Sequence, residues 1–455
     1  MPGLNTSMFI AVQALMAEQG ALSVTSNNIA NVNTPGYSRQ IAILDEAPTF
    51  KEGNLVFGSG VTLQQFQSVR DQLLQLRIYE ETQQQGNSQA QLSSLNQIEG
   101  LFADSSSGIG GALTTFFNSL SQLSADPANA SARTQVLTSA NNLAGQFHQA
   151  VAALGTLRSG LDQAVPQTVN QINQLTEQIA KLNGQVAQMQ GLGKDPGSTQ
   201  DQRDELIRQL SQVINVSVTQ TEHGITLTTA NGVPLVVAGQ SFALQSSTNA
   251  NGLNDVFAQG QDISSQITGG SLAGTLAIRD QVIPGVLNQL DTLTNQLTSA
   301  FNTQHQAGFD LSGNAGQDFF TPQATVAGSA ANFGVAITDP SLVAASSDGS
   351  AGSNGNVAAL LALRDQALPS GASPIQMYSN LVLQVGNLGA NAKADVTAGD
   401  LSLQQLTDQR SAVSGVSLDE ETTNMIRYQR AYQAAAKVVS TVDQMMQSLM
   451  NMVGA

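Results

Sequence analysis

Residues 418–453, which read LDEETTNMIRYQRAYQAAAKVVSTVDQMMQSLMNMV, decide the architecture of this protein. Their apolar side chains recur every seven positions in two rows three positions apart, which is the pattern of one helix of a coiled coil. We therefore predict a helix roughly 54 Å long, at about 1.5 Å per residue. Ser417 is placed to cap its start, and three acidic residues lie in the first turn, where the helix dipole favours negative charge. The rows are Leu418, Met425, Tyr432, Val439, Met446 and Val453, and Tyr428, Ala435, Val442 and Leu449, with Glu421 as the one break.

The amino-terminal end repeats this design. One row of apolar residues spaced by seven consists of Met8, Leu15, Leu22 and Ile29, and its companion row contains Leu4, Ala11 and Val32. Glu18 and Thr25 break the companion row, and Gly20 weakens the helix by about 1 kcal/mol relative to Ala. Between residues 1 and 44 only Glu18 and Arg39 are charged.

Neither end can build a core by itself, because each has only one narrow apolar stripe. We predict that residues 1–40 and 415–455 pair as a terminal coiled-coil domain, with further copies of the chain covering the rest. We also expect these helices to be disordered in a free monomer, since such a stripe does not offset the entropy of ordering. The alternative is a pair of ordinary amphipathic helices on a globular core, because a seven-residue spacing also approximates a 3.6-residue period.

The interior predicts a mainly α protein with inserted β structure. Helical patterns cover 66–102, 109–124, 128–158, 161–190, 199–214, 271–306 and 356 to the end, and residues 38–65 are extended. Between 216 and 268 the apolar period changes to two, and Asn231-Gly232 indicates a hairpin. We expect an elongated helical-bundle middle domain from 41–215, 271–306 and 356–414, with a small β domain, 216–270, projecting from it. Residues 307–355, which we expect to form loops and short strands, are assigned to the middle or an outer domain.

Composition excludes several classes of function. The 455 residues carry a net charge of −16 and no basic run, which argues against binding to nucleic acid or to an anionic membrane surface. Only 11% of residues are charged. Cysteine is absent, so neither a disulfide nor a thiolate metal site can form. No apolar run reaches the ~18 residues of a transmembrane helix, and the amino terminus lacks the basic region of a secretory signal.

No arrangement of residues indicates catalysis, a cofactor or a resident metal. His148 lies in a helical pattern, His223 in a turn, and His305 at a helix end, where a partly charged imidazole would suit the dipole. None has a second ligand at metal-binding spacing. The oxygen side chains of Asp310, Ser312, Asn314 and Asp318 could surround calcium, but they lack the spacing of an EF-hand loop. Asx-turns explain them equally well.

Residues 21–37, ALSVTSNNIANVNTPGY, resemble the amino-terminal signature of the flagellar rod, hook and hook-associated proteins. Residues 414–441 are similar to the closing segment of the same family, and SGVSLDEE is closest to its hook-associated protein 1 branch. Internal stretches such as DQRDEL at 201–206, and Arg279-Asp280, agree. The signature positions are Asn27, Asn28, Ile29, Ala30, Asn31, Asn33, Thr34, Pro35, Gly36 and Tyr37.

This resemblance implies a structural protein that leaves the cell unfolded through the flagellar type III apparatus and forms a ring, or one helical turn, joining hook to filament. It implies as partners further copies of the chain, the hook protein, hook-associated protein 3 and an export chaperone on the carboxy-terminal helix. The terminal helices would line an inner tube. Two alternatives remain: a distal rod or hook subunit, against which the helical interior argues, and an exported effector with axial-type termini, against which the lack of a catalytic cluster argues.

Overall fold

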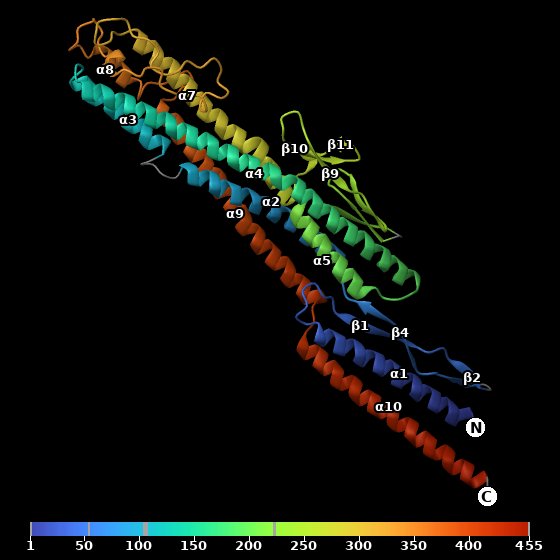
Figure 1. Ribbon diagram of the computed structural model, residues 1–455. Coiled ribbons are helices and arrows are strands. Elements are labelled where there is room, and N and C mark those ends of the chain that lie inside the picture. Colours follow the sequence, from blue (N-terminus) through green and yellow to red (C-terminus); the bar gives the residue numbers. More distant parts are fainter. Residues whose placement is uncertain (1, 53–54, 103–107, 222–223, 454–455) are drawn as a thin grey trace. The chain divides into compact units, whose positions relative to one another are not determined.

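The computed structural model describes residues 2–52, 55–102, 108–221 and 224–453 (Figure 1). The chain divides into two compact units. Unit 1 consists of Met1–Gln84, Asn170–Leu244 and Gly399–Ala455, and unit 2 of Gln85–Val169 and Gln245–Ala398. Long helices dominate both units, with a few small antiparallel sheets, so the predicted class, mainly α with inserted β structure, is confirmed.

In unit 1 the two terminal helices, α1 (Pro2–Ala30) and α10 (Leu418–Val453), lie side by side and antiparallel, with both chain ends at the same end of the pair (Figure 1). A two-stranded sheet of β1 (Gln40–Glu46) and β4 (Val61–Ser68) packs on α1. A short hairpin, β2 (Phe50–Glu52) and β3 (Leu55–Phe57), extends from it. A Cβ on Gly20 would lie 2.6 Å from Leu63 Cδ2. The glycine that weakens α1 therefore lets β4 approach the helix.

A second part of unit 1 contains the end of α4 (Ala130–Gly191), α5 (Gly197–Val213) and a four-stranded sheet. Its strands are β5 (Ser217–Thr221), β6 (Gly224–Thr228), β7 (Pro234–Val237) and β8 (Gln240–Ser241). The expected Asn231-Gly232 hairpin joins β6 and β7, with Gly232 at φ +83°. Buried Asn183 of α4 donates to the Ile225 carbonyl and accepts from its N–H, so the helix holds β6 by both backbone groups.

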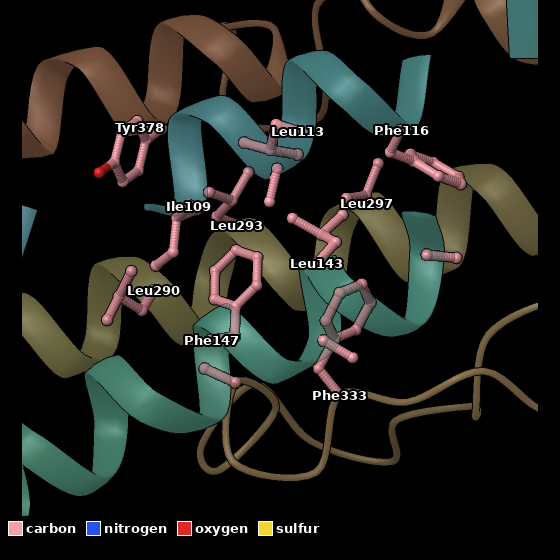
Figure 2. Close-up of a cluster of buried hydrophobic side chains, with 14 of the residues drawn as sticks. Ile109, Leu113, Phe116, Leu143, Phe147, Leu290, Leu293, Leu297, Phe333 and Tyr378 are labelled. Carbon is pink, nitrogen blue, oxygen red and sulfur yellow. The ribbon is translucent and has the colours of Figure 1, made fainter. Parts of the chain in front are cut away.

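Unit 2 is a helical bundle around an apolar core (Figure 2). It contains the end of α2 (Gln72–Phe102), α3 (Ile109–Ala125), the first part of α4, α7 (Ile283–Gln306), α8 (Gly355–Ala362) and the start of α9 (Pro374–Ser414). At one end of the core four aromatic rings pack in tilted and edge-to-face arrangements with centroids 4.8 to 6.1 Å apart, which adds specific geometry to burial. These rings are Phe116, Phe301, Phe319 and Phe320.

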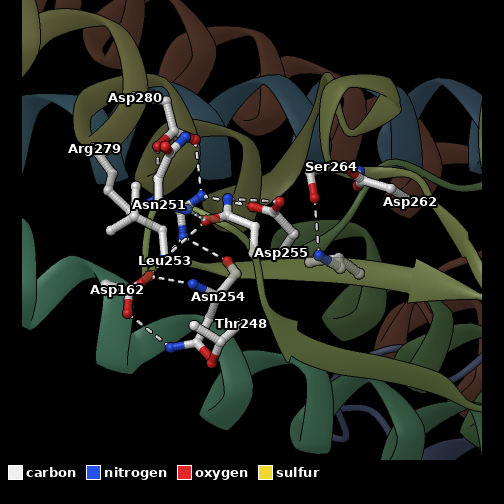
Figure 3. Close-up of polar contacts among 12 residues, drawn as sticks. Asp162, Thr248, Asn251, Leu253, Asn254, Asp255, Asp262, Ser264, Arg279 and Asp280 are labelled. Carbon is white, nitrogen blue, oxygen red and sulfur yellow. Dashed lines mark hydrogen bonds and ion pairs between the residues drawn. The ribbon is translucent and has the colours of Figure 1, made fainter.

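A buried ion cluster holds the three-stranded sheet of unit 2, which consists of β9 (Leu244–Thr248), β10 (Asn254–Ala258) and β11 (Gln261–Asp262). Arg279 is 1% exposed and lies in a π-helical turn, Ile278–Val282, between α6 (Gly270–Ala277) and α7. Its guanidinium contacts Asp162 of α4 at 2.8 Å, Asp280 at 2.8 Å and Asp255 of β10 at 3.4 Å (Figure 3). One side chain thus ties α4, the sheet and the α6–α7 helix together.

The segment between α7 and α8 is loop, and the strands that were expected there together with loops are reduced to isolated bridges such as Phe309↔Ser346. It contains the short 3-10 turn Pro340–Leu342, and a similar turn, Ser264–Gln266, follows β11. Arg133, 1% exposed, donates to the carbonyls of Pro127 and Val343, at 2.7 and 2.6 Å, and so ties this loop to the start of α4.

Three expectations about the elements are wrong. The helix predicted from 66 begins at Gln72, because residues 61–68 pair with β1 as strand β4. The helices predicted at 128–158 and 161–190 are one helix, α4, which continues through Pro166. A proline inside a helix costs about 3 kcal/mol or more. Val165 and Ile172, on either side of Pro166, are fully buried, and burial of apolar side chains acts in the opposite, stabilising direction. The helix expected from 356 is interrupted at 363–373 and 415–417.

The histidine at the end of α7 also differs from the expectation. His305 is fully buried, and burial lowers its pKa, so the imidazole is neutral rather than partly charged. Its Nε2 accepts from the Ala344 N–H at 2.9 Å, so Nδ1 carries the proton and donates to the Gln317 carbonyl at 2.6 Å. It is a structural residue that holds the loop against the helix.

Candidate functional site: the terminal junction

The signature at the end of α1 folds into a compact turn. Helix α1 ends at Ala30, and the Asn31 amide donates to Asn27 Oδ1 at 2.6 Å while Thr34 Oγ1 donates to Asn31 Oδ1. Gly36 has φ +81°, a left-handed conformation that favours glycine. Its carbonyl accepts a hydrogen bond from Arg410 of α9. The turn therefore redirects the chain from α1 into β1.

Asn28 is the most buried polar residue of the signature, at 1% exposure. Its Oδ1 accepts from Tyr37 Oη at 2.9 Å and from the Gln40 N–H at 3.0 Å, and its Nδ2 donates to the Gln40 carbonyl at 2.8 Å. Burial, and then the charges of Asp201 and Glu421, raise the pKa of Tyr37 to about 12, so its phenol stays protonated as a donor. A buried amide is tolerated here because both its oxygen and its nitrogen are hydrogen-bonded.

Ser38 joins the signature to α5, 163 residues away in sequence. Its N–H and Oγ donate to the two carboxylate oxygens of Asp201 at 3.0 and 2.7 Å. Arg70, after β4, bridges Asp201 at 2.7 Å and Asp204 at 2.9 Å. The 201–206 stretch therefore anchors the start of β1 and the end of β4. Burial raises the pKa of Asp204, and the charges of Arg203 and Arg70 oppose this.

Arg39 joins the signature to the carboxy-terminal segment. Its N–H donates to the Ser414 carbonyl at 2.8 Å. Its guanidinium contacts Glu420 at 2.8 Å and Glu421 at 2.9 Å. Glu421, which breaks the apolar row of α10, is 2% exposed, so this break is the buried partner of Arg39. We call the group of Asn28, Tyr37, Ser38, Arg39, Asp201 and Glu421 the terminal junction.

The predicted rows of α10 face α1, with two exceptions. Val442 is buried, and Met425, Tyr428, Val439, Met446 and Leu449 are partly covered. Leu418 is 48% exposed and Tyr432 38%. The side chain of Val453 lies outside the described residues. Ser417 caps the helix through a long bond, 3.5 Å from its Oγ to the Glu420 N–H.

On α1 the predicted row is partly covered, but the most buried residues lie outside it. Met8, Leu15, Leu22 and Ile29 are each only partly covered, whereas Ala11, Ala17, Ala21 and Val24 are buried. The reason is that α1 packs on two sides, against α10 and against the β1–β4 sheet. Small side chains let both neighbours approach closely. Thr25, one of the two predicted breaks in the companion row, is buried. At the other break, burial raises the pKa of Glu18, and the positive charge of Arg427 on α10 opposes this.

The remaining signature positions stay near the surface. Asn27, Ala30, Asn33, Thr34 and Pro35 are exposed. The structure therefore separates the signature into a buried part, Asn28 with its contact to Tyr37, and an exposed part at the turn. Sequence reasoning did not assign Arg39, Asp201 or Glu421 to the site. Sequence signals pointed to two of these three residues: Arg39 is one of two charged residues in 1–44, and Glu421 is the break in an otherwise apolar row.

The candidate calcium loop is closed by its own hydrogen bonds. Asp310 Oδ1 accepts from the N–H groups of Ser312 and Asn314 at 2.8 and 2.9 Å, and its Oδ2 accepts from the Asn314 amide. These are Asx-turns. Within the described residues, no three His, Cys, Asp or Glu side chains are placed to hold a metal. His148 is exposed on α4, and His223 lies outside the described residues.

By length and composition alone, Gly3–Ala30 of α1 could cross a membrane. In the structure one side of this helix packs against α10, and Glu18 lies in its middle.

Comparison with known proteins matches three parts of the chain. Residues 8–37 match the flagella basal body rod protein family, and 408–452 match the flagellar basal body rod FlgEFG protein C-terminal family. Residues 95–320 match the flagellar hook-associated protein FlgK helical domain. Terminal segments of the rod-and-hook type, joined by the terminal junction, define a flagellar axial protein.

Flagellar hook-associated protein 1 of Escherichia coli strain K12 is 28% identical, over 97% of this chain and 98% of that protein. The Bacillus subtilis strain 168 protein of the same name is 29% identical, over 99% of both chains. The solved flagellar hook junction protein FlgK of Burkholderia pseudomallei shares the fold, with a TM-score of 0.67 and 19% identity, over 74% of this chain and 100% of that one. This chain belongs to the flagellar hook-associated protein 1 family. The alignment with the E. coli protein spans 539 positions, so that relative contains segments with no counterpart in these 455 residues.

Proposed function

We propose that this chain is a structural subunit of the bacterial flagellum that joins the hook to the filament. The observation that carries this is the terminal junction, in which the signature after α1 is bound to the start of α10 by Arg39 and to α5 by Ser38. The two terminal segments, 1–40 and 415–455, then act as one assembling domain. Family membership over nearly the whole chain supports the assignment to the junction.

The helical domain favours this function over that of another axial subunit. The two terminal family matches are shared with rod and hook proteins, whereas the match over 95–320 is to the hook-associated protein alone. A distal rod or hook subunit is therefore the weaker proposal. An exported effector with axial-type termini is weaker again, because the family is one of structural flagellar proteins. We accordingly propose that the chain is not an enzyme.

As a flagellar axial protein, the chain assembles with copies of itself and with other flagellar components. We propose the hook protein and hook-associated protein 3 as the neighbours, in a ring or one helical turn outside the cell. We further propose that the type III apparatus exports the chain unfolded, with a chaperone on α10 beforehand. The absence of cysteine supports export as an unfolded chain. The exposed apolar side chains of α10 support a bound partner before assembly.

The test is amide hydrogen exchange on the purified monomer and on the same protein added to hooks isolated from cells that lack it. We expect the parts of α1 and α10 beyond the terminal junction, residues 2–24 and 425–453, to exchange freely in the monomer and to become protected on hooks. A protein that does not add to hooks contradicts the proposed function. Protection of both helices in the monomer contradicts only the coupling of folding to assembly. Arg39→Glu, which places a like charge beside Glu421, should lower addition to hooks, and Lys51→Glu, an exposed site in β2, is the matched control.

A further inference from the structure

Methionine is concentrated at the two ends of the chain. Residues 1–40 and 415–455 make up less than a fifth of the sequence but contain eight of its ten methionines, and four of these lie between 445 and 452. Leucine has a similar volume and a similar helix propensity, so neither packing nor helix formation requires methionine at these positions. Methionine differs from leucine in its thioether sulfur, which is polarisable and can be oxidised.

Four of these thioethers are open to solvent in the isolated chain. Met16 of α1 is 60% exposed, and Met445, Met450 and Met452 of α10 are 44%, 69% and 69% exposed. We call these four residues the exposed methionines. Met445 and Met452 also line a groove of about 390 Å³ whose walls come from both α1 and α10. A small oxidant such as hydrogen peroxide can therefore reach the sulfur atoms.

We propose that the exposed methionines form a reversible oxidation site that controls the addition of this chain to the flagellum. A peroxide transfers one oxygen atom to the thioether, which is oxidised by two electrons to methionine sulfoxide. The sulfur–oxygen bond forms as the O–O bond of the peroxide breaks, and hydrogen peroxide is thereby reduced to water. Methionine sulfoxide reductases, supplied with a thiol reductant, reverse the change.

This inference rests on the proposed function, because only assembly requires these side chains to be covered. The oxygen of a sulfoxide on a solvent-exposed side chain stays hydrated, so the isolated chain should keep its helices. When another flagellar component covers the terminal segments, that oxygen loses its water. Burying it against an apolar surface leaves it without a hydrogen bond, which is unfavourable. Oxidation should therefore weaken the assembled state and leave the fold of the monomer unchanged.

The test compares oxidised and untreated protein in their addition to hooks isolated from cells that lack it. The full-length protein is treated with hydrogen peroxide until peptide mass spectrometry shows oxidation of all four exposed methionines, and the peroxide is then removed. We expect addition to hooks to fall by about tenfold or more, with an unchanged far-ultraviolet circular dichroism spectrum. Repair by methionine sulfoxide reductases should restore it.

A variant that cannot be oxidised at these sites locates the effect. It combines Met16→Leu, Met445→Leu, Met450→Leu and Met452→Leu, and it should keep most of its addition to hooks after the same peroxide treatment. The matched control combines Met189→Leu with Met377→Leu, which removes the two methionines outside the terminal segments. We expect peroxide to inhibit this control as strongly as it inhibits the wild-type protein.

Three results overturn the inference: full addition of the oxidised wild-type protein, equal inhibition of the four-leucine variant and the wild type, or loss of helical signal on oxidation. If the four-leucine variant fails to add to hooks even when untreated, repair of the oxidised wild-type protein decides. Addition that returns as the four sulfoxides are reduced supports the inference, and addition that does not return overturns it. Failure of the untreated wild-type protein to add contradicts the proposed function instead.

Discussion

Removal of the Arg39 side chain tests the terminal junction most sharply. Arg39→Ala leaves the Glu421 carboxylate, 2% exposed, without its charged partner. Breaking a buried pair in this way costs about 3–5 kcal/mol. Because Arg39 is itself 24% exposed, water reaches part of the site, and we expect a loss in the free energy of unfolding near the lower end, about 3 kcal/mol.

The two glutamates that share Arg39 provide the control. Glu420 is 60% exposed, so Glu420→Ala should cost no more than about 0.5–1 kcal/mol, as surface pairs do. Glu421→Ala should fall between these values, because Arg39 keeps Glu420 as a partner. The double variant Arg39→Ala/Glu421→Ala removes the buried orphan charge. It should therefore be more stable than Arg39→Ala alone.

Urea unfolding followed by tyrosine fluorescence measures these differences. The chain has no tryptophan, and four of its five tyrosines, Tyr37, Tyr79, Tyr428 and Tyr432, lie in unit 1. The signal therefore reports mainly on the unit that holds the junction. A double variant that is no more stable than Arg39→Ala, or equal losses for Glu420→Ala and Glu421→Ala, would refute the argument that the burial of Glu421 sets the cost.

Three further predictions concern other buried polar groups. Asn28→Ala should lower the free energy of unfolding by about 2–3 kcal/mol, because it leaves both backbone groups of Gln40 without their partner. The control Asn27→Ala, on the exposed side of α1, should lower it by less than about 0.5 kcal/mol in the same urea assay. Arg133→Met should destabilise unit 2 and raise hydrogen exchange in residues 340–346, since three carbonyls there lose their donor; exchange unchanged from wild type would contradict this. Burial lowers the pKa of His305 in the folded state, so the unfolded chain takes up a proton at a higher pH than the folded chain does. The contribution of neutral His305 to the free energy of unfolding is therefore complete above about pH 6.5 and decreases as the pH drops below it. In thermal unfolding between pH 5 and 8, His305→Gln should lose less stability at low pH than the wild-type protein does. An identical pH profile for both proteins would contradict this.

Several features of the site followed from local sequence. The acidic first turn of α10, the Asn231-Gly232 hairpin and the turn after α1 were predicted because short-range geometry determines them. The rows of α10 were also largely predicted, since that helix has one main neighbour. The predicted row of α1, Met8, Leu15, Leu22 and Ile29, is partly covered as well, but the most buried positions of α1 are mainly alanines, because two neighbours approach that helix. Burial there depends on the β1–β4 sheet, which no helical period can reveal.

By itself, the sequence determined that the two ends are helices with a single apolar stripe, that a β segment interrupts a helical interior, and which family the termini resemble. These properties depend on periods of a few residues. The tertiary structure decided which polar residues become buried partners: Glu421 with Arg39, and Asp201 with Ser38 at a separation of 163 residues. It also decided that α4 continues through Pro166. These features depend on long-range packing, because a buried charge or a proline inside a helix is tolerated only where segments distant in the sequence supply stabilising contacts.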